Sequence, residues 1–236
     1  MIVKYVGHAT FLVTLSKGPV ILFDPWFGKG GFGTSRMVPP ALKQESLSRC
    51  DVILASHAHN DHFDNEAIKL AKRLNSTVIG PSEVGTKAER AGISTERIKI
   101  LDEKDACENN GLIIHGVPAY HPGEALGLVL ETNEGVIYHS GDTILFDELT
   151  NALSDYRIDI ALVTIGGLKI IFRKLMMDYK DAAKLVTKIK PKYAVPMHYR
   201  TFRGLNVDPI KFQEAVNVEN PDIDVIILTP GKSFSL

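Results

Sequence analysis

Both halves of this 236-residue chain combine short apolar strands with an amphipathic helix, and this repetition limits the fold more than any other feature. In the first half a helix is expected from about Glu66, with Asp64 as its capping residue. In the second half a helix is expected over residues 178–189, where Pro191 ends it. Because an amphipathic helix needs a sheet to cover, the pattern predicts two sheets packed together with helices outside, in a single domain over residues 1–236.

Strands are expected where short apolar or alternating runs lie between turn residues. These runs are residues 2–6, 11–15, 19–23, 51–55, 77–80, 98–101, 112–117, 127–132, 136–139, 158–165, 193–197 and 225–228. The glycine-rich segment 28–33 is expected to be a loop, and it matches no nucleotide-binding pattern. It is either a mobile flank of an active site or an ordinary surface loop.

The composition excludes several classes of protein. The net charge is -1, which disfavours nucleic acid as a partner. Two cysteines, Cys50 and Cys107, make no disulfide framework and are expected to be reduced. No apolar run approaches the ~20 residues of a membrane span, and the alternating N-terminal segment resembles a strand rather than a signal peptide. The cytoplasm is therefore the expected compartment.

The segment from Ser56 to His62 carries the pattern H-x-H-x-D-H directly after the expected strand 51–55. His57 and His59 are two residues apart and can point the same way from extended chain. Asp61 and His62 are adjacent and cannot easily join them on one ion, so two neighbouring metal ions explain the cluster better than one. The alternative is a polar turn that caps a helix, but three clustered histidines would repel one another when protonated.

Three further groups of metal-ligand type follow apolar strands. They are His121, Asp142 and His198, which come after strands 112–117, 136–139 and 193–197. Alone, each would be an ordinary loop residue. Beside the H-x-H-x-D-H segment, they indicate one site at the carboxyl ends of strands, because imidazole and carboxylate suit borderline divalent metals.

The chain resembles the metallo-β-lactamase superfamily, in particular small metal-dependent hydrolases similar to ascorbate-6-phosphate lactonase. Besides H-x-H-x-D-H, the resemblance rests on Gly7-His8-Ala9, Phe23-Asp24-Pro25, Tyr138-His139-Ser140-Gly141-Asp142-Thr143, Ile165-Gly166-Gly167, Pro196-Met197-His198-Tyr199 and Pro230-Gly231. It implies an α/β fold, a four-layer αββα sandwich with the site at one edge.

The resemblance also implies a ligand set for two metal ions. One ion would be held by His57, His59 and His121, and the other by Asp61, His62 and His198. Asp142 would bridge the ions, and a hydroxide between them would be the nucleophile. Asp61 would also orient the water or accept its proton, unless it is a ligand alone.

Two other histidines, His8 and His139, are expected near the site, where they donate hydrogen bonds to ligands, touch substrate, or merely pack. His115 lies inside a strand and is expected to be structural. His59 argues against a di-iron electron-transfer relative, where Glu is expected, and Asp142 argues against classical β-lactamases, where Cys is expected.

The segment 168–177 is longer, more basic and more apolar than the short turn that the resemblance leads one to expect. It is interpreted as a lid, an oligomer contact or a docking strip, or else as an extension of the following helix packed on its own core. Exposed apolar groups in such a segment mark a contact surface.

These features together predict a metal-dependent hydrolase that cleaves an ester, lactone or phosphoester bond of a small anionic substrate. The cofactors would be two divalent metal ions, Zn²⁺ with Mn²⁺ as the alternative. Two other functions stay open: a phospholipid-directed hydrolase, and a non-catalytic protein that binds metal or a partner. A homo-oligomer is compatible with each of these functions.

Overall fold

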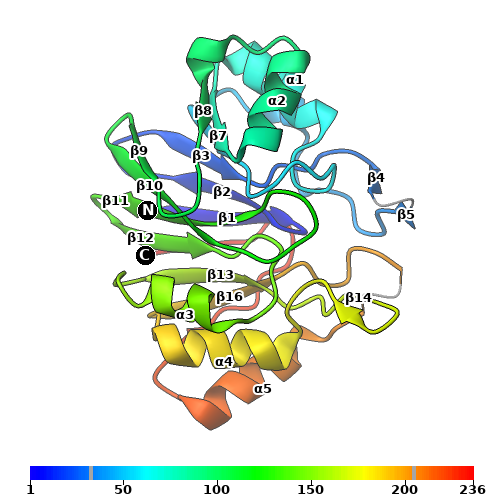
Figure 1. The fold of residues 1–236 in the computed structure, drawn as a ribbon, viewed down its shortest axis with the longest axis vertical. Coiled ribbons are helices and arrows are strands. Elements are labelled where there is room, and N and C mark those ends of the chain that lie inside the picture. Colours follow the sequence, from blue (N-terminus) through cyan, green and yellow to red (C-terminus); the bar gives the residue numbers. More distant parts are fainter. Residues whose placement is uncertain (32–33, 204–205) are drawn as a thin grey trace.

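The computed structural model describes residues 1–31, 34–203 and 206–236, so the last two residues of the expected glycine-rich loop lie outside the described part. The first sheet has seven strands in the order β18-β1-β2-β3-β6-β7-β8 (Figure 1). Their bounds are β1 Ile2–Gly7, β2 Thr10–Thr14, β3 Val20–Phe23, β6 Val52–Leu54, β7 Thr77–Gly80, β8 Ile98–Ile100 and β18 Ser233–Ser235. Strands β3, β6, β7 and β8 run parallel to one another.

The second sheet also has seven strands, in the order β17-β16-β13-β12-β11-β10-β9. Their bounds are β9 Ala106–Asn109, β10 Leu112–Pro118, β11 Leu126–Thr132, β12 Gly135–His139, β13 Ile160–Thr164, β16 Tyr193–Met197 and β17 Asp224–Val225. Strands β12, β13, β16 and β17 are parallel. Each sheet therefore has a parallel part, and loops follow the carboxyl ends of these strands.

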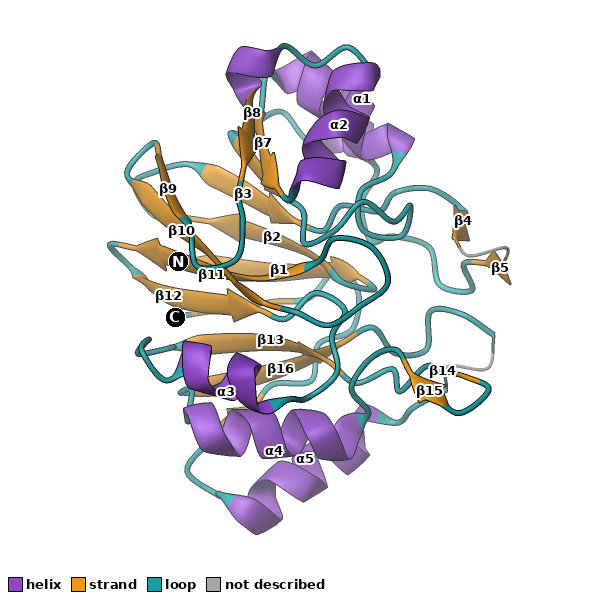
Figure 2. Ribbon diagram, viewed as in Figure 1, coloured by secondary structure: helices purple, strands orange, loops and turns teal. Residues whose placement is uncertain are grey.

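The helices lie on the two outer faces of the stacked sheets (Figure 2). They are α1 Asn65–Leu74, α2 Ser82–Arg90, α3 Asp147–Leu153, α4 Tyr179–Ile189 and α5 Pro209–Glu219. Asp64 caps α1 by accepting a hydrogen bond from the Ala67 amide, as the sequence predicts, and Asp178 caps α4 in the same way.

Three apolar clusters correspond to the three interfaces of a four-layer αββα sandwich. Alternate residues of one strand serve different interfaces: Leu162 of β13 packs between the sheets, whereas Val163 packs against the second helical layer. Ile53 of β6 likewise faces α1 and α2. Strands buried on both faces explain the continuous apolar runs of the sequence, and the predicted fold class is confirmed.

Several elements differ from the sequence-based prediction. Helices α2, α3 and α5 and strands β9 and β18 were not predicted. The expected strand 225–228 is wrong in its extent, because only β17, Asp224–Val225, pairs with β16. The glycine-rich segment contains a short strand, β4 Gly30–Gly31, which pairs with β5 Thr34–Ser35.

The segment 168–177 is a β-hairpin, so its interpretation as a helix extension is wrong. Strands β14 Lys169–Ile170 and β15 Arg173–Lys174 pair antiparallel around a two-residue tip. At the tip Ile171 is 86% and Phe172 98% exposed. Behind the hairpin, residues 175–177 turn back into the core and are buried. The hairpin projects from the same side of the sandwich as β4 and β5 (Figure 2).

Among the described residues, no helix has the length and apolar character needed to cross a bilayer.

Candidate metal centre

The H-x-H-x-D-H segment forms a tight turn between β6 and α1. The carbonyl of His59 accepts hydrogen bonds from the amides of His62 and Phe63, at 3.0 and 2.9 Å. Before the turn, His57 still pairs as a bridge with Ala125 and keeps an extended backbone. The turn therefore separates the two halves of the segment, and they join different groups of ligand-type side chains.

The first cluster consists of His57, His59 and His121, whose ligand atoms all lie within 4.8 Å of one another. His57 contacts the Ser56 hydroxyl through Nδ1 at 3.0 Å, and His121 contacts the Leu175 carbonyl through Nδ1 at 2.9 Å. These contacts leave the Nε2 atoms of both rings buried without a hydrogen-bond partner among the described residues.

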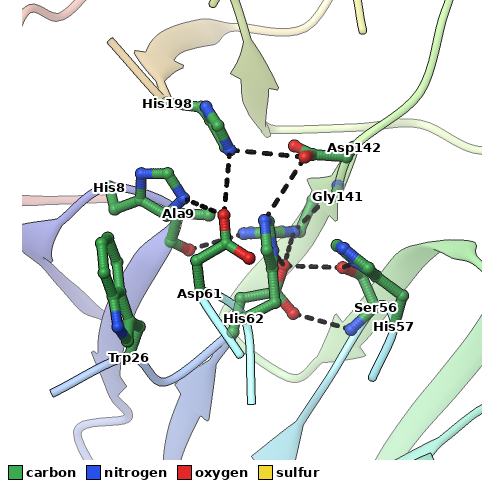
Figure 3. A network of polar contacts seen from close by, with 12 residues as sticks. His8, Ala9, Trp26, Ser56, His57, Asp61, His62, Gly141, Asp142 and His198 are labelled. Carbon is green, nitrogen blue, oxygen red and sulfur yellow. Dashed lines mark hydrogen bonds and ion pairs between the residues drawn. The ribbon is translucent and has the colours of Figure 1, made fainter. Parts of the chain in front are cut away.

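The second cluster consists of His8, Asp61, His62 and His198, again with ligand atoms within 4.8 Å of one another (Figure 3). His8 Nε2 lies 3.3 Å and His198 Nε2 4.0 Å from Asp61 Oδ2. All four residues are buried. His8 and His198 have positive φ values of 63° and 61°, and the His198 amide donates to the His8 carbonyl at 2.9 Å.

Asp142 lies between the two clusters. Its Oδ2 is 3.5 Å from His62 Nε2 and 3.3 Å from His198 Nε2 on one side. On the other side it is 3.9 Å from His121 Nε2. Ligand atoms around a tetrahedral zinc ion are separated by roughly 3.4 Å, as bond lengths of about 2.0–2.1 Å require. The spacing around Asp142 is thus suited to a carboxylate shared by two ions.

The donor set fits metal ions on a second ground. Buried atoms of ligand type that make no hydrogen bond within the described residues include His57 Nε2, Asp61 Oδ1, His62 Nε2, His121 Nε2, Asp142 Oδ1 and His198 Nε2. Burying a polar atom without a partner costs free energy, so such atoms rarely converge without reason. Cations among them would satisfy these atoms together.

A buried carboxylate, Asp24, supports ligands from both clusters. Its Oδ2 lies 2.6 Å from His62 Nδ1 and accepts a hydrogen bond from the Ser56 hydroxyl at 2.7 Å. The same hydroxyl contacts His57 Nδ1. Asp24 thereby directs His62 and, through Ser56, His57.

This role was not predicted from the sequence. A usable signal existed, because Asp24 directly follows β3, which is parallel to the β6 strand that precedes the H-x-H-x-D-H segment.

His8 and His139 lie in different surroundings. The aromatic ring of His8 is 3.8 Å from that of His198, centre to centre, and its Nε2 faces Asp61. His139 accepts at Nδ1 from the Gly141 amide, so its Nε2–H donates to the Ala9 carbonyl at 2.9 Å. His8 is therefore placed to act on a ligand, whereas His139 is held by the backbone. His115 pairs with Glu131 away from the site.

Burial and charge act in opposite directions on the site's ionisable groups. Burial holds the pKa of His57 well below its ordinary value, and neighbouring His62 adds to the effect. For His62, burial also disfavours the charged form, but the carboxylates of Asp142 and Asp24 outweigh it and raise its pKa. The Asp142 pKa is lowered because His198 and His62 outweigh its burial. Divalent cations need neutral imidazole and ionised carboxylate, the forms that the shifts of His57 and Asp142 favour. His62, whose pKa is raised, would have to release a proton to bind a metal ion.

The fold and the paired clusters define a metal-dependent hydrolase. The chain belongs to the beta-lactamase superfamily, whose domain model matches residues 2–198.

Among curated proteins, the chain is similar to a UPF0173 metal-dependent hydrolase of Methanopyrus kandleri, with 32% identity over 99% of both chains. It is 34% identical to another of Caldivirga maquilingensis, over 99% of this chain and 97% of the relative. Among solved structures, the metallo hydrolase Igni18 of Ignicoccus hospitalis is 25% identical with a TM-score of 0.80, and the match covers 100% of this chain and 98% of Igni18. An isothiocyanate hydrolase from Delia radicum gut bacteria shares the fold, with a TM-score of 0.81 at 18% identity over 100% of this chain and 99% of that one.

Proposed function

We propose that the chain hydrolyses an ester, lactone or phosphoester bond of a small anionic substrate with two divalent metal ions. The observation that carries this proposal is the position of Asp142, which lies within 4 Å of ligand atoms from both clusters. The first ion would be held by His57, His59 and His121, and the second by Asp61, His62 and His198. Asp142 would join the two.

Two bound cations would supply an activated water and would stabilise the oxyanion that develops on the substrate. The protein's own contribution is to fix the donors. Asp24 and the Leu175 carbonyl orient His62 and His121, so that the Nε2 atoms of both rings face the centre. Asp61 has one oxygen near His8 and His198, while its Oδ1 has no hydrogen-bond partner among the described residues. We assign this carboxylate the task of orienting the attacking water or accepting its proton.

Zinc is the proposed metal, with manganese as the alternative. Five of the seven ligands are imidazoles, and nitrogen-rich sites with few ligands suit zinc. Two carboxylates, Asp61 and Asp142, bring the site closer to the mixed donor sets that accept manganese. Elemental analysis of protein purified without added metal distinguishes them.

The decisive experiment couples metal content with turnover. We expect about two ions per chain at saturation and a metal-dependent rate on a panel of esters, lactones and phosphoesters. A protein that never exceeds one ion, even with metal added, contradicts the dinuclear site. A protein that binds two ions but turns over nothing on the panel is a metal-binding protein without this activity.

A second function, hydrolysis at a phospholipid surface, is favoured by one observation. Ile171 and Phe172 protrude from the β14–β15 hairpin, and Lys169 and Arg173 flank them. Apolar side chains beside cations bind anionic membranes. Co-sedimentation with phosphatidylglycerol vesicles tests this function. If a Phe172→Ser variant sedimented with the vesicles as much as wild type does, the hairpin would be excluded as the membrane-binding element. A homo-oligomer that buries the same tip is the competing outcome, which light scattering detects.

A further inference from the structure

The three cations of the β14–β15 hairpin are not equivalent. Lys174 forms ion pairs with Asp178, at 2.9 Å, and with Asp181. Lys169 lies opposite Lys174 in the pairing register and is exposed. Arg173 donates from Nη2 to the hydroxyl of Tyr120 at 2.9 Å, and its guanidinium carbon lies 5.6 Å from the ring centre. In the described part of the chain, no carboxylate pairs with Arg173.

Tyr120 is joined through its backbone to the loops that carry two of the predicted ligands. It directly precedes His121, and its amide donates to the Thr143 hydroxyl at 2.9 Å, one residue beyond Asp142. The Met177 amide donates to the Thr143 carbonyl at 2.8 Å. The hairpin's return segment is therefore bonded to the same loop as the bridging carboxylate.

The hairpin is also joined to His121 directly. The Leu175 carbonyl contacts His121 Nδ1 at 2.9 Å, and Arg173 lies two residues before Leu175. Two residues of extended chain span about 7 Å. Arg173 is thus tied to the segment that carries His121 in two ways, through its contact with Tyr120 and through Leu175.

We propose that the Arg173–Tyr120 pair is the subsite for an anionic group of the substrate, a carboxylate or a phosphate. Arginine has five donors in a planar fork that matches these groups, and Tyr120 occupies one of them while fixing the fork in place. Tyr120 is half-exposed and Ile170 and Phe172 are exposed, so an apolar linker has a surface to contact. The substrate class is an amphiphilic anion whose charge lies several bonds from the bond that is cleaved.

This inference rests on the proposed hydrolase function, and its test uses matched ester probes. The anionic probes are mono-4-nitrophenyl esters of dicarboxylic acids with increasing chain length, and 4-nitrophenyl hexanoate is the neutral probe. With the metal-loaded protein, Arg173→Gln should raise KM for the long anionic esters about tenfold. Loss of one charge-assisted hydrogen bond typically weakens binding by about this factor. Its kcat, and both constants for the neutral ester, should stay within twofold.

Lys169→Gln is the matched control, because it removes the same charge from the same hairpin without touching Tyr120. It should leave KM for every probe within twofold. Tyr120→Phe keeps the ring and frees the fork, and should raise KM for anionic esters about threefold. Equal rises in Arg173→Gln and Lys169→Gln would show only bulk electrostatics, and no rise in Arg173→Gln would exclude the subsite. Either result overturns the proposal.

A binding measurement separates this inference from failure of the hydrolase function. If no ester is turned over, the hydrolase proposal fails for esters. The subsite is then tested separately, by calorimetric titration of metal-free protein with the mono-anilide of suberic acid, which is not hydrolysed. Wild type should bind it about tenfold more tightly than Arg173→Gln, while Lys169→Gln binds as wild type does. Equal binding by all three proteins, or no binding by wild type, overturns the subsite.

Discussion

The two clusters of ligand-type residues are built in different ways. In the first cluster, His59 is only half-buried and the ligands come from ordinary backbone. In the second cluster every residue is buried, and His8 and His198 hold a left-handed backbone that costs a non-glycine residue about 1–2 kcal/mol. The first cluster is therefore partly open to solvent at His59, whereas the second is fixed within the core at a cost in stability.

Substitution of Asp142, which lies between the two clusters, should have the largest effect on metal affinity. Asp142→Asn should weaken both metal sites, each by more than about 100-fold, because the neutral amide cannot balance the charge of two cations. His59→Ala should empty mainly the first site and His198→Ala mainly the second. Chelator-competition titrations with elemental analysis measure the three variants. Identical losses in Asp142→Asn and His198→Ala would contradict the assignment of a bridging ligand.

Substitution of Asp24 should have the next largest effect on metal affinity, although Asp24 is not a proposed ligand. Asp24→Asn weakens the contact that orients His62, and the second site should lose roughly 10–100-fold in metal affinity. Ser56→Ala is the matched control, since it removes the contact to His57 of the first site and leaves the contact between Asp24 and His62 in place. The same titration, on variants whose circular dichroism matches wild type, should therefore show the two sites responding to different variants. If Asp24→Asn left the second site unchanged, the assignment of Asp24 to His62 would be wrong.

The buried cluster should also make the metal-free protein sensitive to acid. Burial, reinforced by neighbouring His198, lowers the pKa of His8 from 6.5 to about 3. Between these values the unfolded chain binds a proton that the folded chain does not, so stability is full above pH 6.5 and falls as the pH drops towards 3. The slope is about 1.4 kcal/mol per pH unit for one proton.

Urea unfolding of chelator-treated protein between pH 7 and 4 measures this slope. His8→Asn should reduce it by about one proton, because asparagine does not titrate and tolerates a positive φ. His62 acts with the opposite sign, since its raised pKa favours the folded state on acidification. An unchanged slope in His8→Asn would show that His8 is not the acid-labile group.

The smallest expected effect is on the free energy of unfolding, and it tests the backbone strain at His198. His198→Gly in metal-free protein should raise the free energy of unfolding by about 1 kcal/mol relative to His198→Ala, because glycine adopts the left-handed conformation without cost. At His59, where φ is not positive, Gly should be less stable than Ala. Denaturant melts of the four variants would refute the comparison if both positions behaved alike.

Much of the fold follows from the sequence because burial produces local patterns. Strands β7 and β16 match their predicted bounds, since both are short apolar runs between turn residues. Helix α1 is predictable from its apolar face and the Asp64 cap. Helix α5 buries Phe212 and Val216 but leaves Ile210 and Val218 exposed, so its apolar residues do not mark one face. Asp208 at the cap and Pro209 in the first turn are its clearer signals. The pattern alone could not separate this helix from a loop.

The metal-binding motif can be predicted from the sequence, but the side chains that orient its histidines cannot. The H-x-H-x-D-H segment concentrates ligand types locally, so it is visible without a structure. The role of Asp24 depends on contacts across 32 and 38 residues, to Ser56 and His62. The β14–β15 hairpin was missed for another reason: its tip is Ile171-Phe172, not the glycine or asparagine that such turns favour, and Ile171 has a φ of 57°.

The contact between His8 and His198 has a consequence for how the protein is made. The first cluster has all its side chains once the ribosome has passed residue 121, but the second waits for residue 198, although His8 is among the first residues translated. At roughly 5–20 residues per second, the nascent chain spends several seconds with one set of imidazoles complete and the other lacking its last member. Under the proposed two-ion assignment, the order of synthesis would give the partly exposed first cluster the first opportunity to bind a metal ion. The buried second cluster would bind its own ion only when translation is nearly finished.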